Sequence, residues 1–242
     1  AAGPDILLAM FRRSGRRRDA RGAGWEALAR ELELTPGDDL AGRLPDQLGL
    51  GPGEVAPVYT LARPGQPRLV LFDQARERVG PTGRVEGLRT CVLVRAEPGV
   101  SLVSVRVNER LGRAMELIEA GRTGSVRVDT GDDPVFDGRL AAYARDVAGA
   151  RSLLTRPVRE ALYRLLCSGP PAAGPDGLPV RGRVAPVVVI GGRNVLLTLE
   201  EPEPVGFERL AAAAADMLGL YAALAAAAAL AAATDDGRGD RP

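Results

Sequence analysis

The 242-residue chain contains no histidine and no lysine, so arginine supplies all 32 of its basic residues. Without histidine there is no imidazole general base, no His metal ligand and no Ser-His-Asp or Cys-His nucleophile system. Without lysine there is no Walker A phosphate loop and no Schiff-base lysine. The sequence therefore excludes the commonest hydrolase, kinase and pyridoxal mechanisms, and it offers no convergent catalytic or cofactor-binding set.

Cysteine and aromatic residues are also scarce. The chain has two cysteines, Cys91 and Cys167, and aromatic residues make up only 4% of it. Two distant cysteines do not form a disulfide framework, so we interpret both as small buried apolar residues, compatible with a reducing cytosol. The core must then consist mostly of Val, Leu and Ala.

The remaining composition is that of a globular protein, with 45% hydrophobic and 26% charged residues. Abundant Ala, Gly, Arg and Pro beside the missing lysine is typical of a GC-rich bacterial genome. The net charge of +1 gives no overall attraction to nucleic acid or membrane. Any electrostatic function must therefore come from local clusters.

Hydrophobic periodicity predicts an α+β fold of antiparallel β-hairpins with packed helices and a long C-terminal Ala-rich helix. We expect helices over residues 25–34, 109–120, 147–154 and 156–167. We expect strands over residues 55–61, 68–72, 88–96, 101–107, 125–129, 140–144, 180–190 and 195–199. Hairpins are predicted across 64–67, 97–99 and 191–194, and loops over 74–87 and 168–179.

The chain divides into a basic tail, two α+β units and a polar tail. The predicted ranges are 1–24 for the basic tail, 25–122 and 123–234 for the two units, and 235–242 for the polar tail. Each unit has hairpins followed by a helix. The pattern fits either two separate units or one continuous antiparallel sheet with helices on one face, and the sequence leaves both open.

The last predicted helix, Gly206 to Ala233, is rich in alanine and carries an apolar seam. The seam residues are Leu210, Ala214, Met217, Tyr221, Leu224 and Ala228. After Asp216 the uncharged stretch is just short of a membrane span and mostly alanine, so we favour a helix docked on protein. It packs within the chain or forms the seam of a homodimer; both interpretations stay open.

An acidic turn is the best candidate for a ligand site. It holds four carboxylates, those of Asp129, Asp132, Asp133 and Asp137. Oxygen ligands of this kind suit Mg²⁺ or Ca²⁺, so the turn is a candidate metal site. Its spacing matches no EF-hand loop, and Asp and Gly are also the residues that turns prefer, so we favour a structural role.

The basic tail holds the one marked cluster of positive charge. Its members are Arg12, Arg13, Arg16, Arg17, Arg18 and Arg21. They follow the short apolar run Ile6–Phe11, and this combination predicts contact with an anionic membrane surface, or else a solvated tail. Nucleic-acid phosphates would also attract these arginines, but no aromatic residues are interleaved with them, so we disfavour that interpretation.

The chain has a helix that begins with Trp25, a segment Asp132–Asp137 that leads into a strand, and a stretch Ala150–Thr155 before a helix. These three features together resemble a group of uncharacterised bacterial domain-of-unknown-function proteins. The resemblance covers about residues 25–200 and is one of hydrophobic pattern. Some members of the group carry N-terminal membrane anchors. The resemblance implies an α+β fold and no catalytic residues. On physical grounds we expect Phe136 to be a core anchor and Asp137 a turn or cap residue.

These observations lead us to expect a non-catalytic binding or scaffold protein of the bacterial cytoplasm, peripheral to the inner face of the membrane. We expect it to bind a protein partner that the sequence does not identify, and no cofactor. Two alternatives stay open: a metal-dependent hydrolase that uses Asp129–Asp137, and a nucleic-acid-binding accessory protein that uses Arg12–Arg21.

Overall fold

The computed structural model describes residues 24–48, 50, 53–80, 83–107, 124–167, 184–200 and 205–236. Its elements are, in order, β1 (Thr35–Pro36), α2 (Asp38–Ala41), α3 (Leu44–Leu48), β2 (Val55–Leu61), β3 (Arg68–Gly80), β4 (Gly83–Val107), β5 (Val126–Val128), α5 (Pro134–Arg139), β6 (Leu140–Ala144), α6 (Val147–Leu153), α7 (Arg156–Cys167), β7 (Val184–Glu200) and α8 (Phe207–Asp236). Residues 24–31 form one further helical segment. The fold is α+β, as the periodicity predicts.

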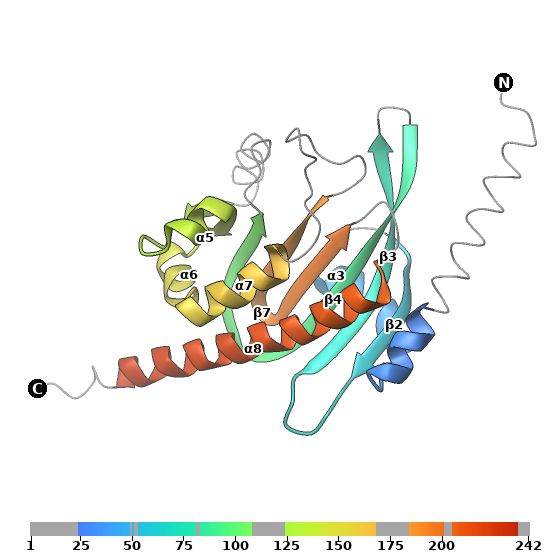
Figure 1. Ribbon diagram of the computed structural model, residues 1–242, viewed down its shortest axis with the longest axis horizontal. Coiled ribbons are helices and arrows are strands. Elements are labelled where there is room, and N and C mark those ends of the chain that lie inside the picture. The colour runs from blue at the N-terminus through green and yellow to red at the C-terminus, as the bar shows by residue number, and fades with distance from the viewer. Residues whose placement is uncertain are drawn as a thin grey trace, which may run out of the picture.

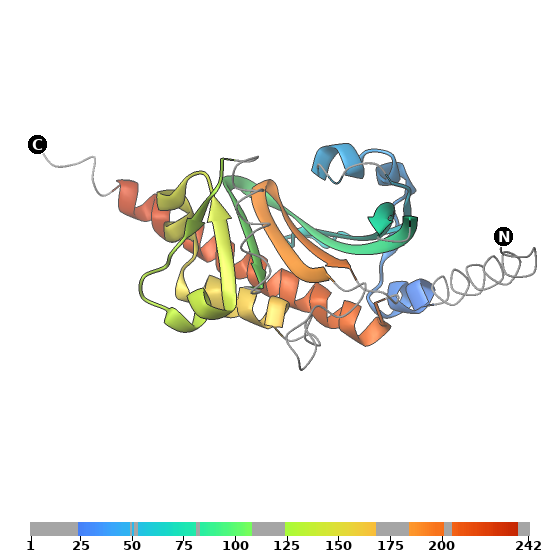
Figure 2. The ribbon, with the colours of Figure 1, turned by 90° about the horizontal axis from the view of Figure 1, so that it is seen from above.

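The strands form a single antiparallel sheet in the order β1-β2-β3-β4-β6-β5, with β7 paired along β4. β4 comes from the first predicted unit, whereas β6 and β7 come from the second, so strands of both units share one sheet (Figure 1). The sheet curves, with α7 and α8 on one face and α2 and α3 at one end of the other (Figure 2).

The arrangement of β4 and β7 differs from the predicted hairpin across residues 97–99. Val92 pairs with Leu71 of β3 on one side and with Leu197 of β7 on the other, so its stretch of β4 has no free edge. Val105 is likewise flanked by Ala142 of β6 and by β7. The two runs of β4 therefore do not pair with each other, and the predicted hairpin between them is wrong. Register shifts on either side of Val100 mark where β4 changes its neighbours.

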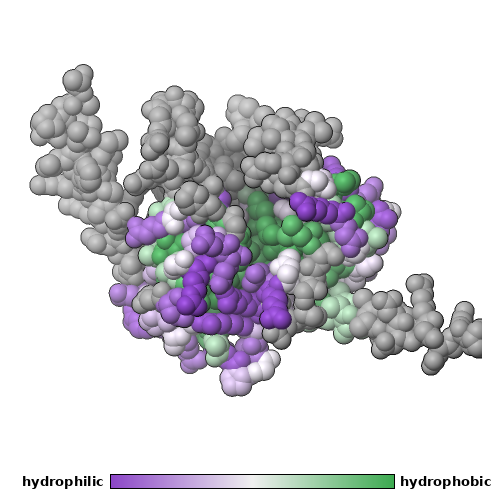
Figure 3. Space-filling view, turned by 180° about the vertical axis from the view of Figure 1, so that it is seen from behind, coloured by the Kyte–Doolittle hydropathy of each residue, from purple (hydrophilic) through white to green (hydrophobic). Residues whose placement is uncertain are grey.

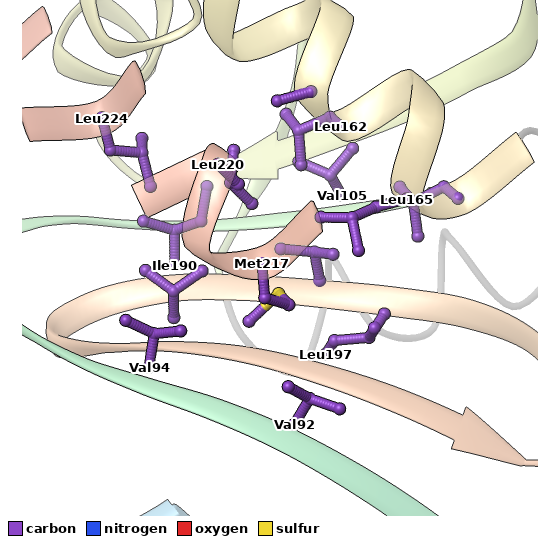
Figure 4. Close-up of a cluster of buried hydrophobic side chains, with 14 of the residues drawn as sticks. Val92, Val94, Val105, Leu162, Leu165, Ile190, Leu197, Met217, Leu220 and Leu224 are labelled. Carbon is purple, nitrogen blue, oxygen red and sulfur yellow. The ribbon is translucent and has the colours of Figure 1, made fainter. Parts of the chain in front are cut away.

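β7 occupies the space between those two runs because it turns back on itself. The hydroxyl of Thr198 donates to the carbonyl oxygen of Val187, 11 residues away, at 3.5 Å. Gly192 has a φ of +57°, which favours glycine, and the ribbon reverses direction within β7 (Figure 4). The reversal predicted across residues 191–194 is therefore present. A Cβ at Gly191 would lie 2.6 Å from Leu102 Cδ1, which is the end of an exposed side chain that has room to move.

The predicted loop over residues 74–87 is also wrong. β3 continues to Gly80 and β4 begins at Gly83, and the two strands pair from Arg68↔Arg95 as far as Gly80↔Gly83. The arginines, glutamates and glycines of this stretch are typical of loops, but a long ladder of backbone hydrogen bonds orders them as strand.

Two apolar clusters lie on opposite faces of the sheet. The larger cluster lies under α6, α7 and α8, and the smaller one lies under α2 and α3 around Leu44, Phe72 and Leu93. Phe72 and Leu44 are both fully buried, and so is Cys91 beside them, which confirms its interpretation as a small core residue. Cys167 is only half-buried, and burial raises the pKa of its thiol.

α8 packs the seam predicted for it against the sheet and α7 (Figure 4). Met217 and Leu220 are fully buried, and Leu224 is 5% exposed. Residues Phe207–Leu230 are long and apolar enough to cross a membrane by length and composition, but the seam lies in the core of the protein. α8 therefore contributes one face to the core, while more than half of its apolar span is not buried, and dimerisation through it stays a prediction.

The helix predicted at 109–120, the whole loop predicted at 168–179 and most of both tails lie outside the described residues. The remaining helices and strands are present with bounds that differ by a few residues. Three short helices are not predicted: α2 and α3 fall in a Pro- and Gly-punctuated stretch, and α5 falls in the segment predicted as an acidic turn.

Candidate functional site

The predicted acidic turn contains the start of a helix. Asp133 is the N-cap of α5, and its side chain accepts a 2.9 Å hydrogen bond from the backbone N–H of Phe136. Pro134 occupies the first turn, where a missing N–H costs nothing. Phe136 is 3% exposed and belongs to the larger core cluster, so it anchors the helix to the sheet.

Arg159 of α7 holds this turn against the rest of the protein. Its side chain is 9% exposed and donates to both carboxylate oxygens of Asp132, at 2.8 and 3.1 Å. Its Nε lies 3.2 Å from Asp133 Oδ2, and its Nη1 also donates to the carbonyl oxygen of Leu154 at 3.1 Å. The hydrogen bond from Arg159 lowers the pKa of Asp132 below its ordinary value of 3.8.

The other two carboxylates of the turn are bound to the turn's own backbone and hydroxyl groups. Asp137 accepts from the hydroxyl of Thr130 at 2.8 Å and from its backbone N–H at 3.2 Å. Asp129 accepts from the backbone N–H of Gly131 at 2.8 Å, and Gly131 has a φ of +75°. The four predicted carboxylates therefore lie in one short segment, the turn and the first turn of α5, and each has a hydrogen-bond or ion-pair donor from the protein.

A cation at this turn would have to compete with those donors. Mg²⁺ and Ca²⁺ require six or more oxygen ligands, whereas Asp132 and Asp133 already face the guanidinium of Arg159. Across the part of the chain that the structure describes, no group of three or more His, Cys, Asp or Glu side chains is placed to hold a metal ion. The contacts fit the structural interpretation, and the metal site stays a prediction from sequence.

Arg159 could have been found from the sequence. It lies between Val158 and the buried Ala161 and Leu162 in α7, so helical spacing places its stem close to the buried stripe. A buried arginine needs an anionic partner, and the acidic turn precedes it in the chain. The basic cluster Arg12–Arg21, in contrast, lies outside the described residues.

The structure also contains a second cluster of buried polar side chains, which no pattern in the sequence predicts. Asp73 of β3 is 1% exposed and accepts hydrogen bonds from Trp25 Nε1 at 2.7 Å and from Thr90 Oγ1 at 2.9 Å. The Trp25 ring also stacks on Tyr59, with ring centroids 5.6 Å apart. These contacts join the helical segment 24–31 to β2, β3 and β4.

Comparisons with known proteins give one structural likeness. No protein-family model matches the chain, and no curated protein matches it. The crystal structure of the mycobacterial trehalose monomycolate transport factor A, TtfA, is similar with a TM-score of 0.51 at 13% sequence identity. The likeness covers 87% of this chain and 93% of the transport factor. It shows that the two chains share a fold over nearly the full length of both. Together with the missing family match, this is consistent with the weak resemblance to an uncharacterised family.

Proposed function

We propose that this chain is a non-catalytic accessory factor that binds a partner at the inner face of a bacterial membrane and serves a transport process there. The observation that carries the proposal is the fold shared with a mycobacterial transport factor over 87% of this chain.

The internal pairing of the polar side chains also supports a binding role. Asp132, Asp133 and Arg159 hold α5 against α7, and Trp25, Asp73 and Thr90 hold the first helical segment on the sheet (all with hydrogen bonds or ion pairs of 3.2 Å or less). Groups of this kind position elements of a scaffold. The membrane part of the proposal depends on the arginines of 12–21, beside the apolar run Ile6–Phe11.

Vesicle flotation tests the membrane part. The probe is phosphatidylglycerol–phosphatidylcholine vesicles, with pure phosphatidylcholine vesicles as the neutral comparison. The full chain is compared with a variant in which the six arginines of 12–21 are changed to Gln. We expect flotation of the full chain with the anionic vesicles, lost in the Gln variant and weakened by salt, because the attraction is electrostatic.

A second variant provides the matched control. It changes six exposed arginines of the folded part to Gln, namely Arg30, Arg43, Arg127, Arg139, Arg156 and Arg164, so its net charge equals that of the first variant. Flotation should persist in this control. Equal loss in both variants, or no flotation of the full chain, would overturn the membrane part.

Proximity labelling in cells tests the partner part. The full chain carries a fused biotin ligase, and the Gln variant of 12–21 carries the same fusion. We expect integral membrane transport proteins to be enriched with the full chain over the Gln variant. Enrichment of soluble proteins alone would overturn the accessory role in transport.

A further inference from the structure

Two arginines face each other directly across β3 and β4. Arg68 is the register partner of Arg95, and Arg95 is in turn the partner of Asn194 on β7. Directly paired residues of antiparallel strands project from the same face of a sheet, with Cβ atoms about 5 Å apart. The three side chains therefore form one row across three strands. We name this row the arginine row.

The arginine row borders the smaller apolar cluster. Two residues further along each strand, the same face carries Val70, Leu93 and Leu196, all three members of that cluster. The surface view of this face shows hydrophilic side chains gathered over α2 and α3, with apolar side chains over the neighbouring part of the sheet (Figure 3). The aliphatic parts of the Arg68 and Arg95 side chains therefore begin beside an apolar surface, and both residues are only partly exposed.

Like charges directly opposite each other on a sheet are destabilising unless an anion compensates them. Within the described ranges, neither arginine has an ion-pair partner, and the side chain of Arg95 makes one hydrogen bond, donated to Gln47 Oε1 of α3 at 2.5 Å. The Nε atoms of both arginines are also buried, and no described residue accepts a hydrogen bond from either of them. Buried donors of this kind are rare in proteins and call for a partner.

At the other end of the smaller cluster, the charge of another arginine is neutralised by a carboxylate on the neighbouring strand. Arg89 of β4 is the register partner of Glu200 on β7, and their side chains form an ion pair at 2.6 Å. Six residues along β4, the β7 partner of Arg95 is the neutral Asn194. Beside Arg89, the β7 residue is therefore a carboxylate that neutralises the arginine. In the arginine row, the β7 residue is a neutral amide, and the two cations have no carboxylate at that position.

We propose that Arg68 and Arg95 form a binding site for a phosphate monoester. Two guanidinium groups present planar forks of N–H donors that match phosphate oxygens, and a monoester carries close to two negative charges at neutral pH. The amide of Asn194 lies in the same row and adds a neutral donor. The phosphate can belong to a soluble metabolite or to a lipid headgroup, and the site's chemistry is the same for both.

Titration calorimetry of the full chain with inorganic phosphate and with glycerol 3-phosphate tests the site. We expect saturable binding that weakens at least about tenfold in Arg68→Gln and in Arg95→Gln, because each removes charged hydrogen bonds. Arg63→Gln is the matched control from the same hairpin, since Arg63 is half-exposed and paired with Glu33 at 3.0 Å. Equal weakening in the control, or no binding by the folded wild type, would overturn the proposal.

The variant Asn194→Asp tests the same site independently, because it should raise the melting temperature while it abolishes phosphate binding. The new carboxylate takes the position relative to Arg95 that Glu200 takes relative to Arg89. We expect this variant to melt at a higher temperature than the wild type in phosphate-free buffer and to lose phosphate binding. Phosphate should raise the melting temperature of the wild type and leave that of Asn194→Asp unchanged. A lower melting temperature together with retained phosphate binding would overturn the proposal.

Vesicles containing phosphatidic acid separate the two sources of phosphate. The background is the chain with the six arginines of 12–21 changed to Gln, so the tail contributes nothing. Flotation that is lost in Arg95→Gln assigns the site to a lipid headgroup, whereas calorimetric binding without flotation assigns it to a soluble monoester. Absence of both overturns the site. The site can therefore fail while tail-dependent flotation of the proposed function succeeds, and the reverse.

Discussion

The indole nitrogen of Trp25 lies 2.7 Å from Oδ2 of Asp73 and donates a hydrogen bond to it across a separation of 48 residues. Both side chains are buried, at 3% and 1% exposure. The contact fixes the helical segment 24–31 to the middle of β3, and the stacked ring of Tyr59 fixes its angle from the neighbouring strand.

Trp25→Phe is expected to lower the free energy of unfolding by about 1–3 kcal/mol, because it removes a hydrogen bond to a buried carboxylate. Urea unfolding followed by circular dichroism measures this, since the variant lacks the chain's single Trp. The smaller ring also leaves a cavity, so Asp73→Asn and the double variant complete a mutant cycle. A coupling energy near zero would mean that the hydrogen bond contributes nothing to stability.

The Asp132–Arg159 pair predicts a specific acid sensitivity. The pKa of Asp132 is lowered in the folded state, so its contribution is fully present above its ordinary value of 3.8 and is lost as the pH falls towards the lower folded value. Asp132→Asn should therefore be less stable than the wild type between pH 5 and 7, with the difference shrinking below about pH 4. Urea midpoints at several pH values, with Asp39→Asn on exposed α2 as control, check this. A pH-independent difference would contradict it.

Two leucines of α8 provide a matched pair. Leu224 is 5% exposed and Leu230 is 66% exposed. Leu224→Glu should unfold the protein or cost more than about 4 kcal/mol, because a charge enters the core, whereas Leu230→Glu should change stability by less than about 0.5 kcal/mol. Thermal melting and sedimentation velocity measure both. A folded Leu224→Glu monomer derived from a wild-type dimer would show that the seam lies between two copies.

The acidic turn is expected to bind no divalent cation at millimolar concentration, because Arg159 and backbone donors already bind its carboxylates. Calorimetry with Mg²⁺, Mn²⁺ and Ca²⁺ tests this. The comparison is between the wild type and Asp132→Ala. Saturable cation binding by the wild type that is absent in Asp132→Ala would establish a metal site and support the alternative of a metal-dependent hydrolase.

Local signals in the sequence were reliable where the structure is local. Gly192 reverses β7 within the hairpin predicted across 191–194, and Asp146 caps α6 at the start of the helix predicted over 147–154. Each has the conformation that its residue type favours. The same reasoning failed across 97–99, where turn residues are present but the strand partners lie elsewhere in the chain. Pairing is a non-local choice, which turn chemistry alone does not specify.

The sequence by itself determined the α+β class, the apolar seam of α8 and the presence of one acidic turn, because periodicity and composition act through neighbouring residues. Only the tertiary structure decided that β7 lies between the two runs of β4, that Arg159 binds the acidic turn and that Trp25 binds Asp73. It also placed Arg68 opposite Arg95. The physical reason is that strand register and the burial of charged groups depend on which distant segments meet. A fold shared at 13% identity shows that two very different sequences can satisfy one such arrangement.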